Sequence, residues 1–69
     1  MGWNHRVMKQ KDGDDDYFQI HEVYYKKNGK VDGYTARGTS PCGNSLQELR
    51  EDLELMLKSL DKEILDYEQ

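Results

Sequence analysis

Residues 17–36 read YFQIHEVYYKKNGKVDGYTA, and this stretch decides the fold. Its first ten residues are rich in aromatic and β-branched side chains, which favours a strand over residues 17–26. Asn28-Gly29 is a strong hairpin signal, because both residue types tolerate the left-handed backbone of tight turns. The chain then returns as a further strand over residues 31–36. The stretch therefore predicts a β-hairpin.

Two loop lengths are open for this hairpin. A two-residue loop of Asn28 and Gly29 sets Lys27 opposite Lys30, and a three-residue loop with a left-handed Gly29 sets Lys26 opposite Lys30. Charge does not separate the two registers, because each contains a Lys–Lys pair. Packing favours the three-residue loop, which collects apolar side chains on one face of the sheet. These are Phe18, Ile20, Tyr24, Tyr34 and Ala36, with Ile20 opposite Ala36 and Glu22 opposite Tyr34.

Upstream of the hairpin, residues 3–9 mix the β-favouring Trp3 and Val7 with polar residues, which predicts a first strand. Residues 11–16 carry one glycine and four aspartates, which are typical of a turn between strands. Glycine, serine, proline and asparagine cluster in residues 37–44, and this composition indicates a connecting loop.

A helix is expected over residues 46–60, with a C-terminal tail over residues 61–69. Ser45 and Glu48 form a capping box, in which the Ser45 hydroxyl accepts the Glu48 N–H and the Glu48 side chain reaches back. Downstream of this cap, apolar residues recur within an arc of about 100° at 3.6 residues per turn. They are Leu46, Leu49, Leu53, Met56, Leu57 and Leu60.

These elements predict the α+β fold class. We expect one domain over residues 1–69, a three-stranded antiparallel β-meander followed by one amphipathic helix packed on one face of the sheet. So short a chain buries only about 60% of its unfolded surface, so covering more of it against a twin is favourable. We therefore expect a homodimer. The face left open by the helix, and so the expected dimer face, carries Tyr17, Val23, Tyr25 and Val31.

Charge and cysteine content restrict the partners. Residues 1–44 have a net charge of +1 and residues 45–69 a net charge of −5. The acidic C-terminal third repels nucleic-acid phosphates and attracts a basic protein surface. Cys42 is the only cysteine, which excludes an intramolecular disulfide and agrees with a reducing compartment. No stretch approaches the length of a membrane span or a signal peptide, so we expect a cytoplasmic protein.

The residue types that carry chemistry do not form a known pattern. His5 and His21 have no cysteine or second histidine at metal-ligand spacing. A calcium loop starting at Asp12 would need glycine at its sixth position and a carboxylate at its twelfth, and Tyr17 and Val23 stand there. Spacing alone neither supports nor excludes a nucleophilic pair of Cys42 and His21. We expect no catalytic residue, no cofactor and no metal site.

Aromatic residues on the predicted sheet leave a second function open, the binding of single-stranded RNA by base stacking. Such platforms accompany a basic groove, and here the lysines gather at one hairpin tip. Sheet packing is therefore the favoured interpretation, and nucleic acid is not an expected partner. The aromatic residues are Trp3, Tyr17, Phe18, Tyr24, Tyr25 and Tyr34.

Residues 43–57, GNSLQELREDLELML, resemble the segment that opens the helix of HicB-like domains, a Gly-Asp-Ser/Thr-Leu-Glu-Glu pattern after a three-stranded sheet. The chain is also similar to short standalone bacterial proteins that begin Trp-Asn-x-Arg and share the His21–Tyr25 motif HEVYY. The HicB resemblance implies a β-β-β-α fold, self-association and an antitoxin role of covering a small basic mRNA-cleaving toxin. The family's Leu-Pro-Gly-Cys turn is missing, since Pro41-Cys42-Gly43 follows the predicted third strand.

The favoured function is therefore a non-catalytic protein-interaction module that binds a basic partner. On a helical wheel, Leu55 lies about 180° from Leu46, opposite the apolar stripe. Acidic residues surround it, so the surface offers an apolar anchor within a negative rim. The expected partner-binding residues are Glu48, Glu51, Asp52 and Leu55. A small enzyme is a further alternative.

Overall fold

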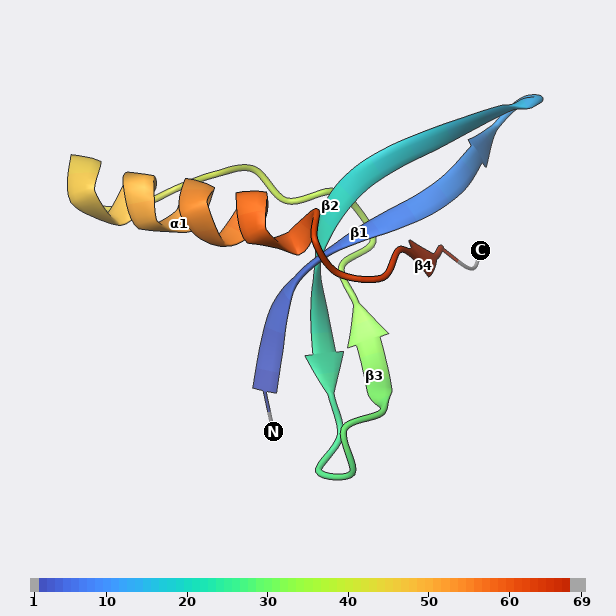
Figure 1. Cartoon of the computed structure of the whole chain (residues 1–69), viewed down its shortest axis with the longest axis horizontal. Coiled ribbons are helices and arrows are strands. Elements are labelled where there is room, and N and C mark those ends of the chain that lie inside the picture. Colours follow the sequence, from blue (N-terminus) through green and yellow to red (C-terminus); the bar gives the residue numbers. More distant parts are fainter. Residues whose placement is uncertain (1, 68–69) are drawn as a thin grey trace.

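The computed structural model describes residues 2–67, which form four strands and one helix (Figure 1). In chain order these are β1 (Gly2–Asp12), β2 (Asp15–Tyr25), β3 (Val31–Tyr34), α1 (Leu46–Ser59) and β4 (Leu65–Asp66). The strands form one sheet in the order β3-β2-β1-β4. Neighbours β1, β2 and β3 are antiparallel, whereas β4 runs parallel to β1. The α+β class is confirmed, and the sheet is mixed rather than purely antiparallel.

The first hairpin is longer than the sequence predicts. Strands β1 and β2 pair without interruption from Gly2 opposite Tyr25 to Asp12 opposite Asp15. Only Gly13 and Asp14 form the loop, and Gly13 has a positive φ of 67° that a glycine adopts without steric cost. Within the expected turn, the Lys11 ammonium lies 2.9 Å from a carboxylate oxygen of Asp16. The ladder thus continues into the acidic run, where it holds one ion pair and also sets Asp12 opposite Asp15.

The second hairpin has the three-residue loop. The Lys26 N–H donates to the Lys30 carbonyl at 2.8 Å, and Gly29 has a φ of 85°. Beyond the loop, however, the register shifts between Tyr24 and Tyr25, so that Gly33 lies opposite Tyr24. Asp32 is the extra residue of this β-bulge.

The bulge makes the predicted register wrong beyond Asp32. Tyr34 lies opposite Val23 instead of Glu22, and the Thr35 N–H donates to the Glu22 carbonyl at 3.0 Å. Because side chains alternate along a strand, this shift of one residue moves Tyr34 to the face away from α1. Phe18 and Ile20 remain on the helix side, where they line a groove with α1.

Helix α1 begins with the predicted cap. The Glu48 N–H donates to the Ser45 hydroxyl at 3.1 Å, and the Glu48 carboxylate accepts the N–H of Asn44 at 3.0 Å. Within the sheet, α1 contacts mainly β1, and the helix extends beyond the sheet (Figure 1). Among the described residues, only Met56 and Ser59 of α1 are buried.

The predicted tail contains a strand. Residues 65–66 form β4 on the outer edge of β1, and the Tyr67 N–H donates to the Lys9 carbonyl at 2.9 Å. The Tyr67 hydroxyl also donates to the Ala36 carbonyl at 2.9 Å. Residues 68–69, the remainder of the predicted tail, lie outside the described residues.

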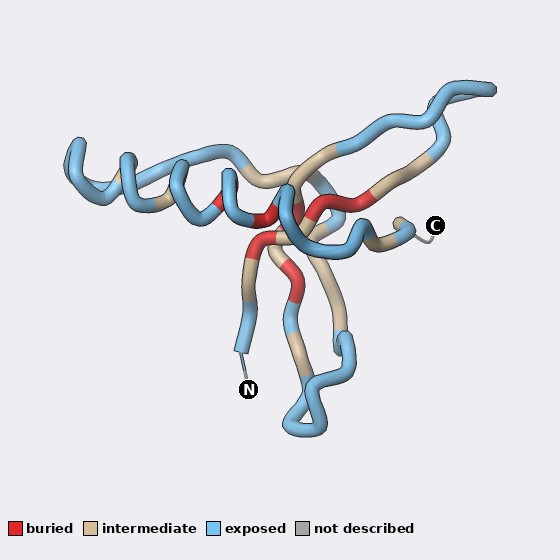
Figure 2. The backbone as a smooth tube through the Cα atoms, in the orientation of Figure 1, coloured by how far each residue is buried: buried red, intermediate tan, exposed pale blue. Residues whose placement is uncertain are grey.

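The core lies on both faces of the sheet. Figure 2 shows the buried segments gathered near the centre, where the strands and the C-terminal part of α1 come together. Val7 and Met8 are adjacent on β1 and both buried, so both faces of this strand are covered. On one face α1 contributes Met56. On the other face the sheet curls, so that Tyr34 and Tyr67 from its opposite edges lie 5.2 Å apart between ring centroids.

Candidate interaction surfaces

The apolar stripe of helix α1 is rotated away from the sheet. The two buried residues of α1 are Met56 and Ser59, and Asp52, which is bonded to β1 and to the connecting loop, lies on the same side of the helix. At 100° per residue, their mean direction lies roughly 80° from the centre of the predicted stripe. Met56 belongs to both sets and Leu49 is half-buried, but the other predicted core leucines are exposed. Their exposed fractions are 85% for Leu46, 48% for Leu53, 66% for Leu57 and 59% for Leu60.

An apolar groove runs between this helix and the β1–β2 hairpin. It has a volume of about 550 Å³. The hairpin contributes Val7, Phe18 and Ile20, and α1 contributes Leu53 and Leu57. Phe18 is itself about half exposed. The groove therefore extends the exposed leucine row of the helix onto the sheet.

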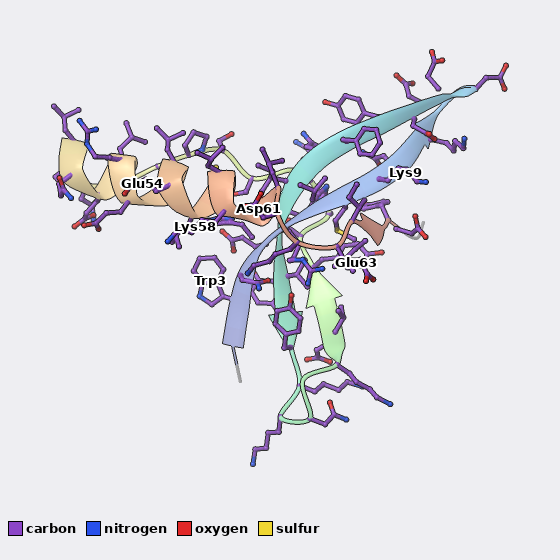
Figure 3. The ribbon with its side chains drawn as sticks, viewed as in Figure 1. Trp3, Lys9, Glu54, Lys58, Asp61 and Glu63 are labelled. Atoms are coloured by element: carbon purple, nitrogen blue, oxygen red, sulfur yellow. The ribbon has the colours of Figure 1, made fainter. Side chains whose placement is uncertain are left out.

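The predicted partner surface around Leu55 is exposed, and it has a second apolar member. Leu55 is 52% exposed and lines a hollow of about 360 Å³ with Trp3 of β1, which is also 52% exposed. Lys58 and Lys62 border the same hollow, and Figure 3 shows Trp3 beside Lys58. The rim is therefore mixed in charge, with acids toward the start of α1 and lysines toward its end.

Three of the predicted partner residues lie in different settings. Glu48 and Glu51 are exposed on the first turns of α1. Glu48 is engaged in the helix cap, and Glu51 accepts a hydrogen bond from Gln47 at 3.1 Å. Asp52 instead faces the sheet, where both carboxylate oxygens have partners within the chain. Asp52 is therefore part of the junction between helix, sheet and loop.

The predicted dimer face is divided by the curl of the sheet. Val23 is 0% exposed, so it belongs to the core and is not available to a second copy. The Tyr25 hydroxyl donates to Asn4 Oδ1 at 2.6 Å and accepts from Arg6 Nη1 at 3.1 Å. Tyr17 and Val31 are exposed near opposite ends of β2. These four residues do not form one open face.

A buried histidine joins β1 to α1, which the sequence pattern does not reveal. His5 Nε2 lies 3.1 Å from Asp52 Oδ1, and His5 is 4% exposed. Asp52 Oδ2 accepts the Cys42 N–H at 2.9 Å. That backbone hydrogen bond is the main cause that lowers the pKa of Asp52; partial burial opposes it, and the His5 contact lowers it further. Helix, sheet and connecting loop meet at one carboxylate.

The second histidine lies in an aromatic cluster on the other face. His21 is 1% exposed, and its Nδ1 lies 2.9 Å from the Thr35 carbonyl. Its ring lies 5.4 Å from that of Tyr67 and 6.4 Å from that of Tyr34. Cys42, in contrast, is exposed beside Asp52, on the helix side of the sheet. Strand alternation thus separates His21 from the Cys42 thiol.

The aromatic residues proposed as a stacking platform are distributed over several surfaces. Trp3 packs edge-on to His5 beside the helix, with ring centroids 5.3 Å apart. Tyr34 lies in the His21 cluster on the other face. The Tyr24 hydroxyl donates to a Glu22 carboxylate oxygen at 2.8 Å, and this contact is the main cause that raises the Tyr24 pKa.

Two further searches concern the described part of the chain. Residues 2–67 contain no cluster of three or more histidine, cysteine or acidic side chains arranged to hold a metal ion. No helix among these residues combines the length and the apolar character needed to cross a membrane.

The chain exposes more surface than a folded monomer of its mass. Its accessible area is 5495 Å² at 8.1 kDa, whereas the size relation for monomeric proteins gives about 4,500 Å². Its radius of gyration is 12.8 Å, against about 11 Å for a compact domain of this length. The excess of about 1,000 Å² is comparable with the roughly 800 Å² that each partner buries in a standard protein interface.

Comparison of the chain with known protein families, curated proteins and solved structures gives no match.

Proposed function

We propose that this protein is a non-catalytic protein-interaction module of HicB-like type that binds a small basic protein in an antitoxin-like manner. The observation that supports this proposal most directly is the amount of exposed apolar surface. Large apolar patches on small proteins are typical of protein-binding sites. In this chain they lie on α1 and beside it.

The surface around Leu55 and Trp3 suits such a partner. Two large apolar side chains border one hollow, and aromatic anchors of this kind dominate binding energies in protein interfaces. Exposed Glu48 and Glu51 lie on the same side of α1, within a C-terminal third of net charge −5. Acidic residues at the rim accelerate encounter with a basic partner and give salt sensitivity. Lys58 and Lys62 border the hollow itself, so the basic side chains of the partner are expected toward the start of α1, beside Glu48 and Glu51.

The cytoplasm is the compartment that we propose. The exposed Cys42 thiol supports this choice, since free thiols persist under reducing conditions.

The test is affinity capture from the native cells, followed by mass spectrometry, with the wild-type chain and two variants. Leu55→Arg removes the apolar anchor and adds a repulsive charge. Tyr17→Arg is the matched control, because Tyr17 is similarly exposed at 46% but lies on the β1–β2 hairpin. We expect a small basic protein that is retained by wild type and Tyr17→Arg and lost from Leu55→Arg.

Two results would contradict the proposal. One is the same set of captured proteins with Leu55→Arg as with wild type. The other is capture that disappears after nuclease treatment, which would favour the RNA-binding alternative.

A further inference from the structure

The exposed leucines of α1 have the spacing of a helix–helix seam. Leu46, Leu53, Leu57 and Leu60 follow one another at intervals of seven, four and three residues. Arg50 lies between Leu46 and Leu53, four residues after the first and three before the second. With Arg50 included, the row has the alternating spacing of four and three residues of a heptad stripe, with one charged member. All four leucines are about half exposed or more. A row with this spacing fits the side of another helix.

We propose that a second copy of this chain covers the row, with the two α1 helices packed antiparallel about a twofold axis near the level of residue 55. The surface excess of about 1,000 Å² over a folded monomer matches what one partner buries in a stable interface. This inference goes beyond the proposed function, because it uses the opposite side of α1 from Leu55.

Charge determines the direction of packing. In a parallel pair, equivalent seam positions meet, so the two Arg50 guanidinium groups would lie against each other. In the antiparallel pair, Leu53 of one copy meets Leu57 of the other, and Arg50 meets Leu60. Asp61 lies in the tighter turn that continues α1 past Ser59, where its N–H donates to the Lys58 carbonyl at 3.1 Å. It stays on the same flank as Arg50, about 20° further round at 100° per residue and about 60° at 120° per residue. Each Arg50 can therefore pair with Asp61 of the second copy, and symmetry makes this contact twice.

The groove beside the row supports a partner helix in the same place. Leu53 and Leu57 belong to both the row and the groove, and Phe18 of β2 borders it from the hairpin. A helix that packs on the row thereby also covers Phe18. A second copy fits this row best, because the same helix supplies both the leucines and the opposite charges that the row would need from a partner.

The first experiment measures the mass in solution by light scattering at about 100 µM. We expect twice the 8.1 kDa of one chain for wild type. Leu57→Asp and, separately, Leu53→Asp should give the monomer mass, because these two leucines meet across the axis, and neither side chain is buried. Gln47→Asp adds the same charge to α1 outside the row and should stay dimeric. A monomeric wild type, or a dimer that persists in both row variants, would overturn the proposal.

The second experiment tests the direction. Arg50→Asp and Asp61→Arg should each weaken the dimer, and the double variant should restore it, because the exchanged charges meet again across the axis. Failure of the double variant to recover would exclude the antiparallel register. A spin label at Gln47→Cys in a Cys42→Ser background gives a distance: about 24 Å along the helix axis for the antiparallel pair, and about 10 Å between axes for the parallel one.

The outcomes for the two surfaces are separable. Leu55→Arg affects partner capture without changing the mass of the dimer, and Leu57→Asp changes the mass. Failure of one proposal is thus distinguishable from failure of the other.

Discussion

His5 Nε2 on β1 and Asp52 Oδ1 on α1 lie 3.1 Å apart and join the helix to the sheet across 47 positions of sequence. Since an ionised carboxylate only accepts hydrogen bonds, His5 Nε2 carries a proton and donates it in this contact. The other oxygen of Asp52 accepts the Cys42 N–H, so the same side chain also fixes the loop before the helix. Asp52 thus links α1, β1 and the connecting loop through polar contacts, in a region where these segments make few apolar contacts.

This junction predicts a loss of stability in acid. The pKa of Asp52 is below its ordinary value, chiefly because the Cys42 N–H donates to the carboxylate. A group with a lowered folded-state pKa stabilises the fold above its unfolded pKa of about 3.9, and the contribution is lost as the pH falls through the folded value. Urea unfolding should therefore show that wild type loses more stability between pH 6 and pH 3 than Asp52→Asn.

Glu51→Gln is the control for that comparison. It also neutralises a single carboxylate, but at the neighbouring residue, which is exposed. It should keep the acid sensitivity of wild type. Equal pH dependence in wild type and Asp52→Asn would show that the junction contributes nothing to the acid response.

Two loop glycines should respond differently to alanine. A Cβ on Gly43 would lie 2.5 Å from the Leu49 nitrogen and 2.7 Å from the Glu48 carbonyl carbon, which are backbone atoms of α1. We expect Gly43→Ala to cost about 1–3 kcal/mol, as overpacking does. A Cβ on Gly38 would meet the side chain of Gln19, which is flexible and can move aside. Thermal unfolding should rank Gly43→Ala clearly below Gly38→Ala, and the reverse order would contradict the described loop.

The helix cap gives a third prediction. Ser45→Ala removes the acceptor for the Glu48 N–H and should lower the free energy of unfolding by about 1 kcal/mol. Ser40→Ala, in the exposed part of the same loop, is the matched control and should have little effect. Chemical denaturation followed by circular dichroism measures both, and equal stabilities for the two variants would mean that the cap is dispensable.

The helix core gives a fourth prediction, which differs from the one that the sequence favours. Met56 is 6% exposed, so Met56→Ala should cost about 2–5 kcal/mol at any protein concentration. Leu53 is a core residue by periodicity but is 48% exposed, so Leu53→Ala should cost much less in the monomer. If the row binds a second copy, the cost of Leu53→Ala grows with protein concentration, because association stabilises the folded state by mass action.

Unfolding curves measured at several protein concentrations separate the cost of Leu53→Ala in the monomer from its cost in the dimer. A cost for Leu53→Ala that equals the cost for Met56→Ala in dilute protein would place Leu53 in the core of the monomer.

The elements that depend on residues close together in the sequence could be predicted from it. Ser45 and Glu48 mark the start of α1 because a cap depends on residues three positions apart. Asn28-Gly29 marks the second hairpin, since Gly29 adopts the left-handed conformation that the loop needs.

Longer-range features have a weak local signal or none. The bulge at Asp32 reverses the side of Tyr34, and its only local sign is the neighbouring Gly33, since a glycine inside a strand permits a bulge without requiring one. Strand β4 has two residues, too few for a periodic pattern. Periodicity identifies the apolar side of α1 but not what covers that side, so it predicts a buried Leu53 and an exposed Asp52, whereas Leu53 is 48% exposed and Asp52 faces the sheet. His5 and His21 are buried because of tertiary contacts alone.

The short loop between β1 and β2 also offers a site at which a label can be inserted into the chain. Gly13 has open space around it and Asp14 is exposed, and the hairpin tip points away from α1 (Figure 1). Exposed loop tips of this kind are the places where proteins best accept inserted segments. An epitope or a fluorescent reporter inserted between Gly13 and Asp14 would leave both sides of α1 uncovered. The protein can thus be followed in living cells while its termini and its helix stay unmodified.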